Sequence, residues 1–378
     1  MVVTAGVASW MYWPSLTQDE AGEVVFSADW SLKELAERNG VSPGELRYKL
    51  SHDVGSISKQ QMKQPIRSLG FSQEAVLGGI EHVHEDKGGP AAVGKYVLWA
   101  AAISVVLAVI LHRKRIGRLR RWWLVGAVLV FGVVLGVSPN PMESVVKLGK
   151  WFGGIQGGPA VVVAAFGLFT LFSVPAAKLV CSWGCQLGAL QESIFNIPLL
   201  RKKYRWHVPF WVSLGARLVL FGAFVVLLFG LGDFVVFHHV NYFKVFRPAE
   251  LAPFAAATVG VMLLASFFVY RPFCQFVCPF GLWAWVLESV APVKVRLDES
   301  KCIHCERCVR QCPTEAMKAR YADKRGFFLP DCWSCGTCRE VCPTDAITFE
   351  AARPGARTHT NETAEAGGSE NSTSSGRH

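Results

Sequence analysis

Five long apolar stretches divide the middle of the chain. They cover residues 96–111, 122–137, 159–180, 212–237 and 254–270. A helix needs about 20 residues to cross a hydrocarbon core of roughly 30 Å, so the shorter stretches lie near the lower limit for a membrane span. The pattern predicts a membrane bundle of about five helices. Residues 1–16 are also apolar but contain Pro14, and a sixth span there is left open.

Composition and charge agree with a membrane protein and add an orientation. The 378 residues are 51% hydrophobic with a net charge of +10, too apolar for an ordinary soluble chain of this size. Alternate loops between the stretches hold eleven basic residues against four in the others, which explains the charge without nucleic acid. We therefore expect the bacterial inner (cytoplasmic) membrane, with the amino-terminal region outside and the carboxy-terminal region in the cytoplasm. The eleven are Arg113, Lys114, Arg115, Arg118, Arg120, Arg121, Lys178, Arg201, Lys202, Lys203 and Arg205.

The first 92 residues precede the five predicted spans, and their pattern predicts a small helical domain. Two short amphipathic helices flank Asn39-Gly40, and Gly70 with Ser72 repeats the pattern of Gly40 with Ser42 thirty residues later. The expected location outside the membrane favours partner docking over DNA binding. Three histidines here are expected to be solvated rather than to bind metal: His52, His82 and His84.

The last part of the chain holds the strongest motif. Cys302-x2-Cys305-x2-Cys308-x3-Cys312-Pro is repeated as Cys332-x2-Cys335-x2-Cys338-x3-Cys342-Pro. Three evenly spaced cysteines wrap one iron-sulfur cube, and the fourth, before proline, ligates the other cube. Two [4Fe-4S] clusters are predicted over residues 298–350, in an α+β domain of the bacterial two-cluster ferredoxin type. Cluster one would take Cys302, Cys305, Cys308 and Cys342, and cluster two Cys332, Cys335, Cys338 and Cys312. Structural zinc is the alternative. Residues 351–378 are expected to be a disordered tail.

A second repeat lies in the membrane region, 93–297. Cys181-x3-Cys185 and Cys274-x3-Cys278 each follow an apolar stretch. Each pair has a basic residue three positions before it, Lys178 or Arg271, and a glycine three positions after it, Gly188 or Gly281. Residues four apart on a helix share one face, so each pair is expected to point at one object. Pro279 suggests that the second pair lies where one helix ends and another begins. Facing halves would bring four thiols together, either as ligands of a third iron-sulfur centre, as redox-active thiols, or as packed core residues.

These motifs together resemble the polyferredoxin membrane family of NapH and the membrane part of NosR, with CcoG as a relative. The resemblance covers roughly residues 95–350, and its nearest type is NapH. Gln186 departs from it, because the family has proline after the second cysteine of a pair. The resemblance implies an electron-transfer component rather than a stand-alone enzyme, acting between the quinone pool or a membrane partner and a reductase or maturation system.

Two other functions stay open at this stage. One is a quinol dehydrogenase or a metal-ion (copper) reductase in the assembly of a respiratory enzyme, and the other is a non-redox scaffold. His238 and His239 are expected to pack at the membrane interface rather than to contact quinol or haem. Arg217 is expected to reach the interface from within its span, without a role.

Overall fold

The computed structural model is mostly helical and describes residues 25–351 with internal gaps. The predicted tail, the first 16 residues, and His238 and His239 lie outside the described residues. The gaps are 54–56, 59, 87–89, 113–116, 137–138, 154–158, 177, 198–205, 231–241, 247–252 and 323–328.

The amino-terminal helices form a module with its own core. Ser31 begins the first helix by accepting a hydrogen bond from the Glu34 amide, and Gly40 and Gly70 turn the chain with left-handed backbone. Leu35, Leu46 and Ile80 lie in the buried core of this module. The elements are α2 (Leu32–Arg38), α3 (Pro43–Asp53), η1 (Gln61–Lys63), α4 (Ile66–Leu69) and α5 (Gln73–Asp86).

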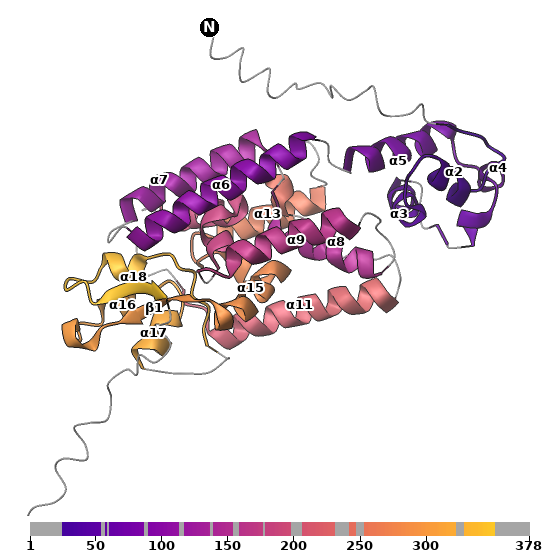
Figure 1. The fold of residues 1–378 in the computed structure, drawn as a ribbon. Coiled ribbons are helices and arrows are strands. Elements are labelled where there is room, and N and C mark those ends of the chain that lie inside the picture. Colours follow the sequence, from indigo (N-terminus) through magenta and orange to yellow (C-terminus); the bar gives the residue numbers. More distant parts are fainter. Residues whose placement is uncertain are drawn as a thin grey trace, which may run out of the picture.

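The apolar stretches form a helical bundle between this module and the carboxy-terminal domain (Figure 1). Among the described residues, two helices are long and apolar enough to cross a membrane, Val93–His112 and Phe210–Gly230. The other predicted spans coincide with shorter helices, so the count of five stays a prediction. The bundle contains α6 (Pro90–His112), α7 (Gly117–Ala127), the π-helical η2 (Val128–Val134), α8 (Pro141–Phe152), α9 (Pro159–Ser173), α11 (Phe210–Gly230), η5 (Tyr242–Phe246) and α13 (Pro253–Ala265).

The outer surface of the bundle is apolar. Trp122 and Val219 are each 71% exposed, and large apolar side chains are also exposed on α6, α9 and α13. Soluble monomers rarely expose apolar patches of this extent, so this surface fits contact with lipid.

Short helices join the bundle to the carboxy-terminal domain at one end. They are η3 (Val180–Gly184), α10 (Gln186–Phe195), α14 (Pro272–Phe276) and α15 (Pro279–Val290). The domain then runs through β1 (Val293–Leu297), η7 (Glu299–Lys301), α16 (Arg307–Gln311), α17 (Ala316–Tyr321), α18 (Thr337–Glu340) and β2 (Ile347–Ala351). β1 pairs antiparallel with β2, which closes the domain by joining its first and last segments. The amide of Val293 also donates to the carbonyl of Pro175, just after α9.

Candidate iron-sulfur sites

The two ferredoxin-type motifs adopt related loops thirty residues apart. His304 and Ser334 are both left-handed, as are Glu306 and Gly336, each of which caps the short helix that follows. Left-handed residues other than glycine are uncommon, so their presence at equivalent positions reflects a shared loop geometry.

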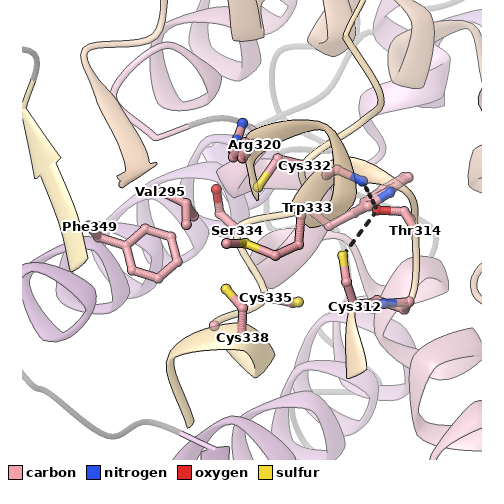
Figure 2. Close-up of a pocket in the computed structure, with 14 residues that line it drawn as sticks. Val295, Cys312, Thr314, Arg320, Cys332, Trp333, Ser334, Cys335, Cys338 and Phe349 are labelled. Carbon is pink, nitrogen blue, oxygen red and sulfur yellow. Dashed lines mark hydrogen bonds between the residues drawn. The ribbon is translucent and has the colours of Figure 1, made fainter. Parts of the chain in front are cut away.

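A cavity lies between the second motif and the end of the first. Its lining includes Cys332, Cys335 and Cys338 together with Cys312 (Figure 2). These are the four cysteines predicted as the ligands of cluster two, three from one motif and one from the other. For the other set, burial raises the pKa of the Cys308 thiol and the neighbouring thiols of Cys302 and Cys342 add to that rise. In both sets, therefore, the last cysteine of one motif lies near cysteines of the other motif, as the crossed arrangement of ligands predicts.

The donor set fits a cluster better than a single ion. Within the described part of the chain, no group of three or more His, Cys, Asp or Glu side chains is placed to hold one metal ion. Tetrahedral zinc needs four ligands at about 2.0–2.3 Å from one point, whereas a cube spreads its ligands over four corners. Thr314, Thr337 and Thr344 also place hydroxyls 3.4–3.7 Å from the sulfurs of Cys312, Cys335 and Cys342.

The paired cysteines of the bundle are all buried, but not on one helical face as expected. Cys181 lies on η3 and Cys274 on α14, whereas Cys185 and Cys278 are the N-caps of α10 and α15. The helix breaks within each pair because its second cysteine has extended backbone. Pro279 and Gln186 both occupy the first helical position, so the departure at Gln186 leaves this local geometry unchanged.

The two pairs lie across from one another. The thiols of Cys181 and Cys278 are close enough to interact electrostatically, and so are those of Cys185 and Cys274. The sulfur of Cys274 is also 3.8 Å from Oε1 of Gln191, on the helix that follows the first pair. The sequence repeat therefore corresponds to facing halves.

The repeated glycines have a steric reason. A Cβ on Gly281 would lie 2.9 Å from the carbonyl oxygen of Cys274, and one on Gly188 would lie 3.0 Å from that of Cys181. In each repeat the second helix crosses the carbonyl of its own first cysteine. Only glycine fits this crossing without a shift of backbone.

Glu192 anchors the first repeat through two arginines. Arg120 binds both carboxylate oxygens at 2.8 Å, and Arg271 binds Oε2 from the second repeat. The Tyr270 hydroxyl donates to the same oxygen at 2.5 Å. Burial raises the pKa of Glu192, but the charges of Arg120 and Arg271 lower it by more than burial raises it. The resulting pKa of Glu192 is about 2. Arg271 also donates to the carbonyls of Cys181 and Ser182, which links the halves at the cysteine pair.

Asp331 anchors the ferredoxin domain to the bundle through two buried cations. Lys178 approaches its Oδ1 at 2.5 Å and Arg217 its Oδ2 at 2.6 Å, and all three residues are buried. The expectation that Arg217 reaches the interface is wrong, because Asp331 offers it a charge partner inside the protein. Arg120 and Lys178, counted above as loop charges, are likewise buried in ion pairs.

Two tryptophans complete the contact between the two cysteine regions. Trp183, between Cys181 and Cys185, donates through Nε1 to the carbonyl of Ser334 at 3.2 Å. Trp333, beside Cys332, lies under the Nζ of Lys178 at 4.6 Å and the guanidinium of Arg271 at 5.4 Å from its ring centroid. The repeated basic residues of the two halves thus meet one indole of the ferredoxin domain.

Sequence reasoning found the cysteines but missed several of these partners. Asp331, Trp183 and Trp333 carry no motif, although their positions beside or between motif cysteines were a usable signal. The dipeptide Glu-Ser occurs after both cysteine pairs, as residues 192–193 and 288–289, but the two copies are not structurally equivalent. Glu288 binds Arg320 and accepts from the Cys332 amide, a different role from that of Glu192. The side chains of His52, His82 and His84 lie outside the described residues.

Comparison with known proteins supports the ferredoxin-type domain. Residues 295–349 match the family model of a 4Fe-4S dicluster domain. The chain is 29% identical over 214 residues to a putative electron transport protein, YccM of Escherichia coli K12, covering 52% of this chain and 59% of YccM. It is 26% identical over 181 residues to the uncharacterized protein MJ0749 of Methanocaldococcus jannaschii, covering 47% and 65% of the two chains.

A third relative is the regulatory protein NosR of Pseudomonas aeruginosa, 27% identical over 177 residues, which cover 40% of this chain and 23% of NosR. No solved structure matches the chain. The chain spans less than two thirds of YccM and of MJ0749. The comparisons support a ferredoxin-type relationship, and they do not single out the NapH type.

The Asp331 ion pairs predict a large effect of one substitution. Asp331→Asn leaves Lys178 and Arg217 buried without a carboxylate, and removing one partner of a buried pair costs about 3–5 kcal/mol. We expect the free energy of unfolding in detergent, followed by circular dichroism, to fall by that amount. The control Glu37→Gln removes an exposed helical pair with Lys33 and should cost about 0.3–0.5 kcal/mol. Equal effects of the two substitutions would contradict the prediction.

Proposed function

We propose that this chain is a membrane-bound iron-sulfur electron-transport protein with two [4Fe-4S] clusters in its carboxy-terminal domain. The observation that carries the proposal is the cavity lined by Cys312, Cys332, Cys335 and Cys338, a ligand set drawn from both motifs. Cys302, Cys305, Cys308 and Cys342 would hold the other cluster. A [4Fe-4S] cluster supplies one-electron carriage when bound, and the chain supplies its thiolates, its burial and the hydroxyls beside its sulfurs.

The membrane location rests on the bundle. The two long apolar helices and the exposed apolar side chains support a lipid-embedded protein. The excess of basic residues in alternate loops supports a cytoplasmic ferredoxin domain and an external amino-terminal module. The partners would then be a membrane redox protein or quinone on one side of the transfer and a reductase or maturation system on the other.

The four buried thiols of the bundle are proposed as a third iron-sulfur site. Among the described residues beside them, Arg120, Lys178, Arg217 and Arg271 are buried against two carboxylates, Glu192 and Asp331. Buried positive charge is costly without a counter-charge. A cluster held by four thiolates is an anion, whereas four thiols are neutral, so the excess of cations favours the cluster over packed thiols.

An enzymatic role is the second candidate function. YccM is described as a putative electron transport protein, and by analogy the present chain would transfer electrons for a partner. A quinol dehydrogenase or a copper reductase in enzyme assembly would need a substrate site in addition. Purified protein that oxidises a quinol analogue or reduces Cu(II) without an added partner would favour this alternative.

Anaerobically purified protein should contain about eight iron and eight sulfide per chain from the ferredoxin domain alone. Reduction should produce the EPR signals of [4Fe-4S] centres. Cys302→Ser and Cys332→Ser should each lower the iron content, because each removes a ligand of a different cluster. An iron-free, EPR-silent wild type, or zinc at these cysteines, would refute the proposed function.

A third site raises the expected iron to about twelve per chain. The double substitution Cys181→Ser with Cys274→Ser removes one ligand from each half and should return the content to about eight. Ser173→Ala is the matched control, since it changes a buried side chain of the same bundle whose hydroxyl has no hydrogen-bond partner. Wild-type protein with eight iron, unchanged in the double variant, would leave the four cysteines without a cluster.

A further inference from the structure

The two ferredoxin-type loops have opposite surroundings although their sequences repeat. We call residues 301–308 the outer loop and residues 331–338 the inner loop. Ile303 of the outer loop is 62% exposed, whereas Trp333, its equivalent in the inner loop, is 2% exposed. His304 is exposed where its equivalent Ser334 is buried. A ferredoxin domain standing alone would have no reason for this asymmetry.

The inner loop is covered by the cysteine-bearing part of the bundle. Its Asp331 binds Lys178 and Arg217, and its Cys332 amide donates to Glu288. The carbonyl of Ser334 accepts from Trp183, which lies between the two cysteines of the first membrane pair. One hydrogen bond therefore connects a residue inside one thiol motif with a residue inside another.

Three polar contacts of the outer loop lie within its own domain. The ring of His304 bonds the Tyr321 hydroxyl at 3.0 Å, and Arg310 donates to the carbonyl of Cys305. Lys301, the first residue of the loop, pairs with Asp298 three residues earlier. The backbone that carries Cys302 and Cys305 thus reaches solvent, with an apolar side chain, Ile303, at its tip.

We propose that the outer loop is the exchange surface for a soluble one-electron carrier and that the inner loop is the connection to the membrane cysteines. This inference rests on the proposed function. The exchange would move one electron: the carrier would be oxidised by one electron and a cluster held by Cys302, Cys305, Cys308 and Cys342 would be reduced by one, with no bond made or broken and no proton moved. Trp183 and Trp333 exclude water from the inner contact, so a soluble carrier cannot approach there.

Charge at position 303 tests the outer loop directly. Reduced methyl viologen is a soluble cation radical, and its bleaching of the iron-sulfur absorbance can be followed by stopped flow on the full chain in detergent. In water, a unit charge about 8 Å from the approaching viologen changes the rate of encounter by about two- to threefold. Ile303→Glu should raise the second-order rate by that factor and Ile303→Lys should lower it, and both effects should fade at high salt.

Lys33→Glu in the amino-terminal module is the matched control and should leave the rate unchanged, since Lys33 lies in a separate exposed helix. Iron-loaded Ile303 variants that reduce at the wild-type rate at low salt would overturn the inference alone. Iron-free wild-type protein would overturn it together with the proposed function.

A spectroscopic measurement gives a second, independent test. In Cys332→Ser the cluster behind the outer loop remains, and in Cys302→Ser the cluster behind the inner loop remains. A soluble gadolinium chelate should enhance the EPR relaxation of the first several-fold more than that of the second. Equal or reversed enhancement would overturn the inference. If either single variant loses both clusters, the same measurement is made on the wild-type protein. Two EPR signals with unequal relaxation enhancement are expected, and one uniform enhancement would contradict the inference.

Discussion

Two buried carboxylates, each held between two cations, set the arrangement of the cysteine regions. Glu192 joins α7 to the second repeat through Arg120 and Arg271. Asp331 joins the inner loop to η3 and α11 through Lys178 and Arg217. A charge in such a place cannot lose its partner cheaply, so the two centres restrict the repeats and the ferredoxin domain to one relative position. Cys181 and Cys274 each follow a paired cation by three residues, and Cys332 follows Asp331 directly, so these ion pairs restrict the positions of these three thiols.

The repeated basic residues show how one local design serves two contacts. Lys178 and Arg271 both have left-handed backbone, which costs an ordinary side chain about 1–2 kcal/mol. Arg271 donates to the carbonyls of Cys181 and Ser182 in the other repeat. Lys178 finds a carboxylate in the ferredoxin domain, whereas Arg271 finds one in the other repeat, and both cations lie against the Trp333 indole. The strain is tolerated where the ion pair and the stacking compensate it.

The sequence indicated the candidate ligand residues more readily than it indicated which distant side chains are in contact. The spacing of the eight carboxy-terminal cysteines predicts two sets of four, and a cavity is lined by the second set, Cys312 with Cys332, Cys335 and Cys338. The first set stays a prediction. Asp331 and Arg217 were not predicted to meet, since a pair separated by more than a hundred residues has no local pattern. The first membrane pair was misread as one helical face, because an extended second cysteine acting as an N-cap leaves only a weak signal at Gln186. At the second pair, Pro279 did indicate the boundary between two helices. The amino-terminal turns at Gly40 and Gly70, in contrast, were predicted from sequence, because glycine between two amphipathic segments is a local signal.

Buried cations also bear on what the two loops can do as redox sites. Each electron added to an iron-sulfur group makes it more negative, so a fixed cation nearby stabilises the reduced form. The inner loop has Arg120, Lys178 and Arg217 close by, but Glu192 and Asp331 pair with these cations in the same low-dielectric site, where charge interactions are stronger than in water. The charges at the outer loop are exposed and screened by salt. The same packing that hides the inner loop from soluble carriers therefore surrounds it with buried, paired charges, whereas the outer loop has exposed and screened ones.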